Sequence, residues 1–208
     1  MKPMRTREPL PPVLCLASAS PRRRELLEQI GVPHLVQPAD LDETRRGGES
    51  PEAYVLRLAR AKAETIFKVR RDASAPPLPV LGADTTVSIE NELLGKPVDE
   101  TDLLEMFARL SGREHEVWSA VALVSARGTT SCSVCTRVRF RVVEPVEARR
   151  YWASGEPCDK AGGYAIQGYG AVFVERIEGS YSGVVGLPLA ETAALLFSAG
   201  IPLWHSGT

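Results

Sequence analysis

An aspartate, Asp84, stands in the middle of residues 79–89, a run that otherwise has the composition of a buried β-strand. An ionised carboxylate in apolar surroundings is costly unless it is paired, hydrogen-bonded or bound to a metal ion. Carboxylates at strand ends also carry the chemistry of many α/β enzymes. Asp84 is therefore a candidate general base. The alternative is an aspartate satisfied by turn backbone, beside a β-bulge at Gly82.

A second group of chemically suggestive residues surrounds the start of a predicted helix. Ser18 and Ser20 precede Pro21, and three arginines follow it at positions 22–24. Unpaired backbone N–H groups and the helix dipole make such a terminus favourable for an anion. Arginines in a first turn oppose that dipole, which indicates a bound anion, although a solvated cationic turn also fits. The chain has neither a Walker A motif nor G-x-G-x-x-G, so a phosphate site here is of another kind.

Further cations and carboxylates lie on predicted loops and helices. Lys62 falls on the apolar stripe of a helix, which fits either a lysine reaching solvent at the edge of the core or a lysine aimed into a polar cavity. Several cations with few carboxylates are typical of a polyphosphate site with a divalent metal ion. The candidate cations are Arg22, Arg23, Lys62, Lys96 and Lys160, and the candidate carboxylates are Asp42, Glu43 and Asp84.

These residues require a scaffold in which strands alternate with helices and hairpins, which predicts an α/β fold with a mixed sheet. In residues 131–143, Arg137, Arg139 and Arg141 alternate with apolar residues, which predicts a solvated sheet face. We expect a flexible extension over residues 1–12 and a single domain over residues 13–208. Strands are predicted at 13–17, 34–37, 79–89, 115–125, 131–143 and 171–177, and helices at 21–31, 102–110, 145–154, 187–200 and from 51 to a linker at 70–79.

The composition excludes several classes of protein. A formal net charge of −1 gives no bulk attraction to nucleic acid or to an anionic membrane. No apolar stretch reaches the ~20 residues of a membrane helix, and residues 1–12 lack the apolar core of a secretory signal, so we expect a cytoplasmic protein. The four cysteines are interpreted as free thiols, because Cys132 and Cys135 on one strand point to opposite faces and could not hold one metal ion.

Short motifs occur in one collinear order between residues 13 and 196. They are LASASPRR at 16–23, LGADT at 81–85, GKP at 95–97, LSG at 110–112, GEP at 155–157 with the glycine-rich run to 168, GSY at 179–181 and VVGLP at 184–188. This set resembles the Maf family of nucleoside triphosphate pyrophosphatases. The resemblance implies a mixed twisted β-sheet with flanking helices, two lobes around a central cleft as in Maf and ITPase-like folds, and a homodimer. The chain departs from the family pattern at Ala165, where glycine is usual, and at Thr86, where a bulkier apolar residue is common.

The resemblance also implies an activity and a role for each matching residue. The family cleaves between the α and β phosphates of a nucleoside triphosphate, giving a monophosphate and pyrophosphate, with Mg²⁺ or Mn²⁺ as cofactor. Asp84 matches the proton acceptor, and Glu43 and Asp84 match the metal-handling positions. The matching phosphate-binding residues are Ser18, Arg23, Lys62, Lys96 and Lys160. Arg22, Thr85 and Gln167 match the positions that set base preference in the branch acting on dTTP and UTP, whereas a branch acting on 7-methyl-GTP differs there.

Two functions therefore stay open at the level of sequence. The first is an enzyme that hydrolyses dTTP and UTP and removes unwanted nucleotides from the pool. The second is a non-catalytic nucleotide-sensing protein that acts on cell division and septum formation through partners. Both need the cations, but only the enzyme needs an ionised Asp84.

Overall fold

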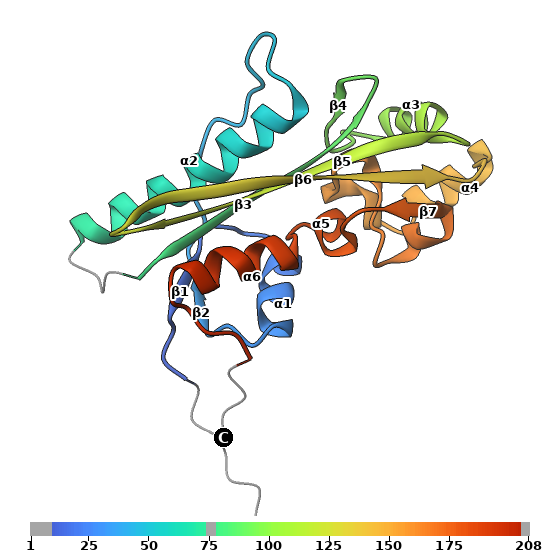
Figure 1. The fold of residues 1–208 in the computed structure, drawn as a ribbon. Coiled ribbons are helices and arrows are strands. Elements are labelled where there is room, and N and C mark those ends of the chain that lie inside the picture. Colours follow the sequence, from blue (N-terminus) through green and yellow to red (C-terminus); the bar gives the residue numbers. More distant parts are fainter. Residues whose placement is uncertain (1–9, 74–77, 205–208) are drawn as a thin grey trace, which may run out of the picture.

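Residues 10–73 and 78–204 are described by the computed structural model. Within them one mixed sheet runs through the whole molecule, and helices flank it (Figure 1). The strands are β1 (Leu14–Leu16), β2 (His34–Val36), β3 (Val80–Ile89), β4 (Glu92–Leu94), β5 (Glu114–Ser125), β6 (Gly128–Phe140) and β7 (Val174–Glu178). The helices are α1 (Pro21–Gln29), α2 (Pro51–Asp72), α3 (Glu100–Leu110), α4 (Pro145–Trp152), α5 (Tyr181–Val185) and α6 (Leu189–Ser198), with 3₁₀ helices η1 (Glu156–Asp159), η2 (Ala161–Gly163) and η3 (Tyr169–Phe173).

The order of the strands combines a parallel and an antiparallel part. The path is β2-β1-β3-β5-β6-β7, with β4 paired to β3 beside it. Strand β1 is parallel to both β2 and β3, whereas β3, β5, β6 and β7 are antiparallel neighbours. The parallel part needs α1 and α2 as crossovers, and the antiparallel part is joined by hairpins. The predicted mixed α/β sheet is confirmed.

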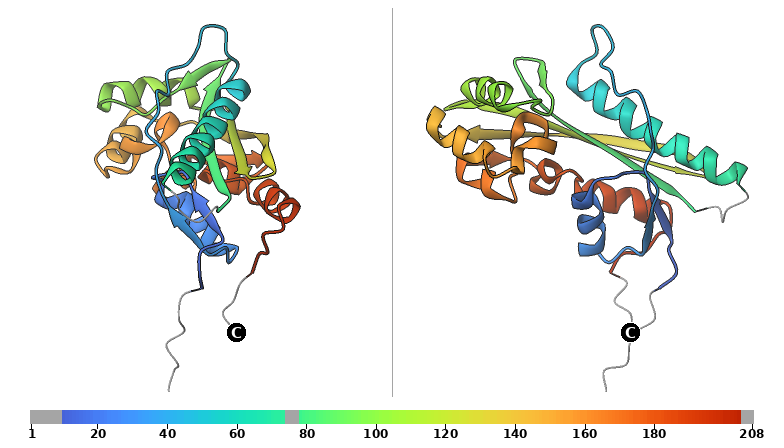
Figure 2. Two further views of the ribbon diagram at one scale, coloured as in Figure 1. Left: turned by 90° about the vertical axis from the view of Figure 1, so that its left-hand side faces the viewer. Right: turned by 180° about the vertical axis from the view of Figure 1, so that it is seen from behind.

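Two apolar layers cover opposite faces of one half of the sheet. Leu14 and Leu16 of β1 pack with α1 and α6, whereas Cys15 between them packs with α2 on the other face. This alternation follows from the two-residue period of a strand. Figures 1 and 2 show α2 on one side of the sheet and α1 and α6 on the other. All of these apolar residues are buried.

Helix α2 lies close against the sheet at Gly82 of β3. A Cβ atom at this position would lie 2.2 Å from the Ala59 carbonyl oxygen and 2.8 Å from the Ala63 nitrogen. Pairing with β5 continues unbroken through Gly82 and Ala122. The alternative of a β-bulge at Gly82 is therefore wrong. The glycine is needed because the helix backbone leaves no room for a side chain.

The other half of the molecule has its own core, built around aromatic rings. Phe107 of α3 packs against Phe140, Tyr151 and Phe173, with ring centroids 5.2–5.9 Å apart. Such edge-on and tilted arrangements are favoured between aromatic rings. Tyr164 joins the same cluster, 4.8 Å from the Phe140 ring. Long strands β3, β5 and β6 connect this core to the two layers at the other half, which gives the predicted two lobes.

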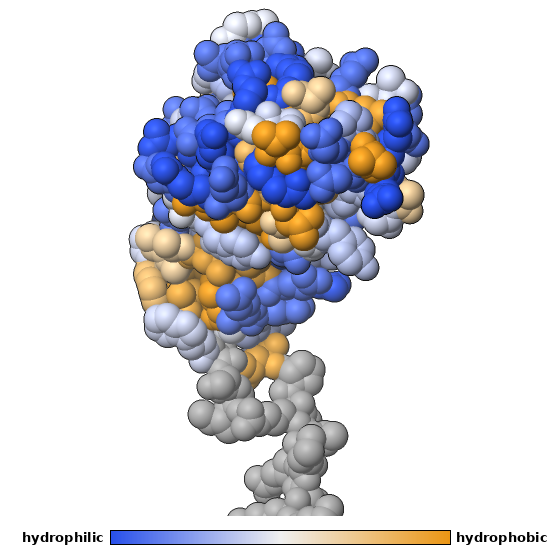
Figure 3. Space-filling view, turned by 90° about the vertical axis from the view of Figure 1, so that its right-hand side faces the viewer, coloured by the Kyte–Doolittle hydropathy of each residue, from blue (hydrophilic) through white to orange (hydrophobic). Residues whose placement is uncertain are grey.

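Arg137 and Arg139 of β6 lie on an exposed face, as the alternation predicts, whereas Arg141 follows the end of the strand and is half-buried. Arg139 contacts Glu175 of β7 at 3.1 Å, and Arg137 pairs with Glu178. Figure 3 shows this end of the molecule, where hydrophilic side chains dominate the upper half and apolar groups show between them. Exposed ion pairs of this kind contribute little to stability.

Several predicted boundaries differ from the structure. Helix α2 continues to Asp72, into the predicted linker. Strand β7 begins at Val174, because residues 169–173 form η3. The short helix α5 was not predicted at all, and Ser20 occupies the N-cap position of α1 without a side-chain capping bond. Most of the predicted N-terminal extension, residues 1–9, lies outside the described residues, so this boundary stays a prediction. No helix in residues 10–73 or 78–204 combines the length and apolar character needed to cross a membrane.

Candidate active site

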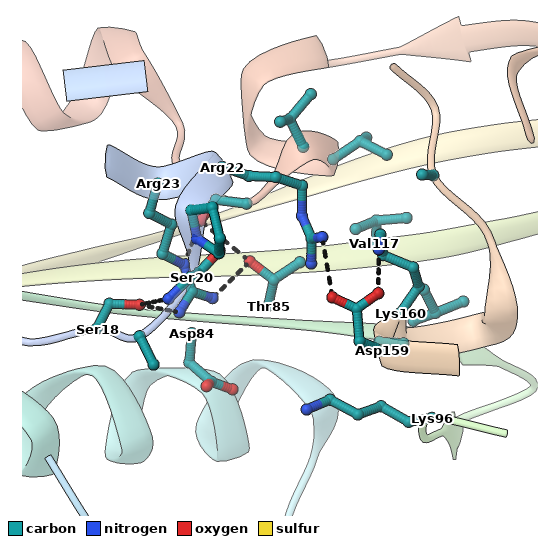
Figure 4. A pocket seen from close by; sticks show the side chains of 18 of the residues that line it. Ser18, Ser20, Arg22, Arg23, Asp84, Thr85, Lys96, Val117, Asp159 and Lys160 are labelled. Carbon is teal, nitrogen blue, oxygen red and sulfur yellow. Dashed lines mark hydrogen bonds and ion pairs between the residues drawn. The ribbon is translucent and has the colours of Figure 1, made fainter. Parts of the chain in front are cut away.

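A cavity of about 350 Å³ opens between the two lobes (Figure 4). Its position follows from the neighbours of β3. Strand β1 pairs with β3 only as far as Leu81, and β4 pairs with it only from Val87. The stretch between, which carries Asp84 and Thr85, therefore has a strand on its β5 side alone. Its other edge faces the cavity, which explains how a carboxylate in the middle of a long strand can reach a substrate.

All residues that the sequence assigned to catalysis, phosphate, metal or base recognition line this one cavity. They come from the turn before α1 and the first turn of α1, the loop before α2, α2 itself, β3, the loop after β4, and the segments around η2. Asp42 is an exception among the wider candidates: it does not line the cavity, and its carboxylate instead accepts a hydrogen bond from the Thr44 amide at 2.9 Å. The lining residues predicted from sequence are Ser18, Arg22, Arg23, Glu43, Lys62, Asp84, Thr85, Lys96, Lys160 and Gln167.

Arg23 is held rigidly at one side of the cavity. Its guanidinium donates to the Gly186 carbonyl at 2.8 Å, to the Ser18 hydroxyl at 3.2 Å and to the Thr85 hydroxyl at 3.4 Å. Thr85 is in turn 3.0 Å from the Ser119 hydroxyl. Burial lowers the pKa of Arg23, and the nearby Asp84 charge opposes that change. A guanidinium fixed in this way presents a preorganised positive charge to an anion.

Two buried residues, Asp84 and Lys62, form a charge cluster with the exposed Glu43 beside Arg23. The Lys62 ammonium lies 2.7 Å from Asp84 Oδ1 and 2.6 Å from Glu43 Oε1. Lys62 is only 8% exposed and Asp84 only 6% exposed. Lys62 is therefore aimed into the cavity, and Asp84 is satisfied by a lysine and not by turn backbone. Burial raises the pKa of the Asp84 carboxyl, and the charges of Lys62 and Arg23 oppose the rise.

The second Asp84 oxygen is placed differently from the first. Within residues 10–73 and 78–204, Oδ2 makes no hydrogen bond, while Oδ1 accepts one from Lys62. Figure 4 shows the Asp84 carboxylate and the Lys96 side chain pointing toward one another across the cavity. Asp84 therefore has one oxygen anchored by a cation and one available to accept a proton.

Glu43 and Asp84 are the carboxylates that could hold a metal ion here. No group of three or more His, Cys, Asp or Glu side chains with metal-site geometry occurs in the described part of the chain. Mg²⁺ commonly binds through one or two carboxylates together with substrate phosphates, so two oxygen donors at a polyphosphate site fit such an ion. In this structure the Lys62 ammonium already contacts both carboxylates.

Across the cavity from Asp84, a further ion pair links the two lobes. Asp159 of η1 accepts a hydrogen bond from Arg22 at 3.4 Å and pairs with Lys160 beside it in sequence. Figure 4 shows Asp159 between these two cations. Sequence reasoning did not assign Asp159 to the site, although its place beside Lys160 in the glycine-rich segment was a usable signal. The Asp159 carboxylate therefore offsets the repulsion between these two cations.

We call Ser18, Arg23, Glu43, Lys62, Asp84 and Lys96 the charged end of the cavity. Another set of lining residues is apolar, and we call it the apolar end: Val87, Val117, Tyr164, Val184 and Val185. Gln167 lies near this end with an exposed side chain. A planar apolar group suits such a wall, and an amide at its rim can recognise polar edges. These apolar residues were not predicted, because nothing distinguishes them in sequence from ordinary core residues.

Comparisons with known proteins find a matching family and relatives over most of the chain. The model of the family described as Maf-like protein matches residues 13–199. The chain is 51% identical over 191 residues to a Hahella chejuensis protein, covering 92% of this chain and 94% of that one. It is 54% identical over 186 residues to an Alkalilimnicola ehrlichii protein, covering 89% and 92%, and 54% identical over 195 residues to a Bordetella parapertussis protein, covering 92% and 94%. Each of these relatives is named dTTP/UTP pyrophosphatase.

Among solved structures, the Staphylococcus aureus Ham1 protein matches with a TM-score of 0.40 and 12% identity, over 61% of this chain and 71% of that one. This likeness is too partial to say anything about function. The family model, by contrast, spans most of the chain, and the relatives cover nearly all of it. The resemblance drawn from the sequence motifs is thereby confirmed: the chain belongs to the Maf-like protein family.

Proposed function

We propose that this protein is a nucleoside triphosphate pyrophosphatase that hydrolyses dTTP and UTP to the monophosphate and pyrophosphate. The names of relatives more than half identical to it support the reaction and the substrates. The observation that carries the proposal is the Asp84 carboxylate, anchored through one oxygen by Lys62 in a cavity lined by five cationic side chains. A site of this charge and volume fits a triphosphate with its base.

The chemistry follows from where these groups lie. Asp84 accepts a proton from a water molecule, which attacks the α-phosphorus and displaces pyrophosphate. Burial makes Asp84 a stronger base than a solvent-exposed aspartate, since it raises the pKa of the carboxyl. Arg23, Lys62 and Lys96 offset the negative charge that grows on the leaving pyrophosphate. The protein thus contributes mainly position and charge, as is usual in phosphoryl chemistry.

We assign the divalent cation, Mg²⁺ or Mn²⁺, to Glu43 and Asp84 together with substrate phosphates. When bound, such an ion polarises phosphate oxygens and makes a bound water more acidic. Lys62 contacts both carboxylates at 2.6–2.7 Å in this structure and offsets part of their negative charge. We therefore expect cation binding to be weak without nucleotide and to tighten when the phosphates draw Lys62 toward themselves.

Base preference is assigned to the rim of the apolar end. The Gln167 amide both donates and accepts, which matches the imide edge of thymine or uracil. Cytosine has an amino group where these bases have a carbonyl, so it leaves polar groups of the site unpaired. Arg22 and Thr85 complete the proposed specificity set. A homodimer in the cytoplasm, acting on the nucleotide pool, is the setting that we propose for this activity.

The test is the identity of the products. Purified protein is incubated with dTTP or UTP and Mg²⁺, and the products are separated by ion exchange, with Asp84→Asn as matched control. We expect monophosphate and pyrophosphate in equal amounts from the wild type, none above background from the variant, and none in excess chelator. Orthophosphate as the first product would indicate a phosphatase. Binding without turnover by wild-type protein would favour the nucleotide-sensing alternative.

A further inference from the structure

The segment 160–167 supplies five cavity-lining residues, among them Lys160, Tyr164 and Gln167, yet it has little regular structure. It consists of η2 followed by residues outside any helix or strand. The Gly162 amide donates to the Gly95 carbonyl at 2.9 Å, which ties the segment to the loop that carries Lys96. Side chains behind the cavity wall also hold the segment in place. Two of them are buried and polar, and each makes a hydrogen bond to it.

The first support is His115 of β5. Its Nε2 lies 2.8 Å from the Tyr164 hydroxyl, and the two rings meet edge to face with centroids 5.5 Å apart. His115 is 2% exposed and does not line the cavity. The Phe140 ring contacts both partners, at 5.0 Å and 4.8 Å between centroids, so neither ring can turn away. The hydrogen bond therefore fixes where the Tyr164 ring faces the cavity.

A histidine at position 115 also has a cost in folding stability. Its Nδ1 is buried and finds no partner within residues 10–73 and 78–204. A buried polar atom without a partner costs stability that an apolar side chain of similar shape would not. Packing alone therefore does not favour a histidine here. Its hydrogen bond to Tyr164 is the feature that an apolar residue could not supply.

The second support is Tyr151 of α4, which contacts the residue that follows Tyr164 in the same segment. Its hydroxyl accepts a hydrogen bond from the Ala165 amide at 3.2 Å and donates to Glu156 at 2.7 Å. Glu156 also accepts from the amides of Tyr169 and Gly170, each at 2.9 Å. The backbone on both sides of Gln167 is thereby tied to one buried unit. Tyr151 itself does not line the cavity.

We propose that His115 and Tyr151 are positioning residues for nucleobase recognition, which fix the wall formed by Tyr164 and the rim formed by Gln167. This inference rests on the proposed function, because it concerns the base of the same substrate. Neither residue reaches the charged end of the cavity. Their loss should therefore weaken the binding of the base while leaving the binding of the phosphates intact, a separation that general damage to the fold would not produce.

The experiment compares a ligand that has a base with one that does not. KM for UTP and the dissociation constant of UMP report on the base, and inhibition by inorganic pyrophosphate reports on the phosphate subsites. In His115→Phe and in Tyr151→Phe we expect KM and the UMP dissociation constant to rise about three- to tenfold, the worth of the one hydrogen bond that each side chain makes to the segment 160–167. Pyrophosphate inhibition should stay as in the wild type. His115→Gln, which retains a polar group near the Nε2 position, should recover part of the loss.

Two further variants keep the outcome decisive. Tyr164→Phe removes the same hydrogen bond from the other side and replaces His115→Phe if that variant fails to fold. Ser111→Ala is the matched control, because the Ser111 hydroxyl bonds the Val143 backbone at 2.8 Å and 3.2 Å but does not line the cavity. It should lower the melting temperature without changing KM.

Two results would overturn the positioning role of His115 and Tyr151. One is that His115→Phe and Tyr151→Phe weaken the binding of UTP and of pyrophosphate equally. The other is that both variants have a lower melting temperature but an unchanged KM. If the wild-type protein neither binds nor hydrolyses UTP, the proposed function is contradicted, and so is the positioning role that rests on it. If the wild type is active with UTP and the variants have an unchanged KM, only the positioning role is contradicted.

Discussion

The charged end and the apolar end of the cavity are built in different ways. At the charged end, the side chains that face the substrate also hold one another: Arg23 bonds Ser18 and Thr85, and Lys62 bonds Glu43 and Asp84. At the apolar end, the facing groups have no such bonds among themselves. The segment that carries Tyr164 and Gln167 is instead held from behind, by a buried histidine and a tyrosine that do not line the cavity.

This difference has a physical reason. Charges in a partly buried site need partners at all times, because an unpaired buried charge is costly. Before the substrate binds, the ion pairs of the charged end supply these partners, and the phosphates can then replace some of them. Apolar side chains such as valine, and the tyrosine ring, attract one another without direction. They can therefore define a wall only if the backbone that carries them is fixed elsewhere.

Asp84→Asn should have the largest effect, because it removes the base from the charged end while leaving the shape of the cavity intact. We expect kcat for UTP to fall by about a thousandfold, in the range that loss of a general base produces. UMP binding should change by less than about threefold, since the apolar end is untouched. Steady-state kinetics together with calorimetric titration of UMP measures both quantities. Near-normal turnover by the variant would make Asp84 a structural residue and place the base elsewhere.

The mutual pairing within the charged end can be tested by Lys62→Met. This change leaves Asp84 and Glu43 without their shared cation, and the loss of one partner of a buried pair costs about 3 kcal/mol of unfolding free energy. Urea unfolding measures that loss. Lys68→Met, on an exposed part of the same helix, is the control and should cost less than about 0.5 kcal/mol. Equal stability of the two variants would mean that the ion pairs of the charged end do not hold one another.

The support behind the apolar end predicts a dependence of stability on pH. Burial lowers the pKa of His115 to about 4, from 6.5. The folded state therefore resists protonation of His115, and the stability that the neutral ring provides above pH 6.5 is lost as the pH falls from 6.5 toward 4. Between pH 7.5 and pH 5 this amounts to about 2 kcal/mol.

The measurement is the free energy of unfolding of wild type and His115→Gln at both pH values. The wild type should lose about 2 kcal/mol more than the variant over this range. Taking the difference between the two proteins removes the contribution of Asp84, whose raised pKa acts in the opposite direction. If the free energy of unfolding falls equally in the two proteins, burial does not keep His115 neutral.

The smallest effect that we predict concerns Gln167, at the rim of the apolar end. Gln167→Ala should raise KM for dTTP and UTP about tenfold, because the imide edge of the base loses its polar partner. The preference of the protein for dTTP and UTP over CTP should therefore become smaller. Turnover number should change little, since the charged end remains complete. A kinetic panel of dTTP, UTP, CTP, ATP and GTP on both proteins gives the comparison. A wild-type preference for a purine triphosphate would overturn the assigned base preference and leave the pyrophosphatase chemistry standing.

The sequence predicted the charged end far better than the apolar end. A carboxylate inside an apolar strand, a lysine on an apolar helical stripe and arginines at a helix start each conflict with local rules, and such conflicts mark functional sites. Asp84, Lys62 and Arg23 were found in this way, and the structure brings them into one cavity. Asp42 conflicts with no such rule. It was included only for its charge, and it lies outside the cavity.

The apolar end could not be predicted, because Val117 and Tyr164 look like core residues and owe their place to strand pairing and to distant hydrogen bonds. Helix α5 was missed because five residues are too few to show helical periodicity. Gly82 signalled something unusual, but sequence could not tell a bulge from a close approach of α2. The regular elements were predictable because their hydrophobic periods are long and consistent.

The most direct test of the central claim is to locate the bond that breaks, by hydrolysis of UTP in water enriched in ¹⁸O with mass spectrometry of the products. If water activated by Asp84 attacks the α-phosphorus, one ¹⁸O atom appears in UMP and none in pyrophosphate. Label in pyrophosphate, or in orthophosphate released as the first product, would mean that another phosphorus is attacked and would contradict the assignment of Asp84 and the charged end to cleavage between the α and β phosphates.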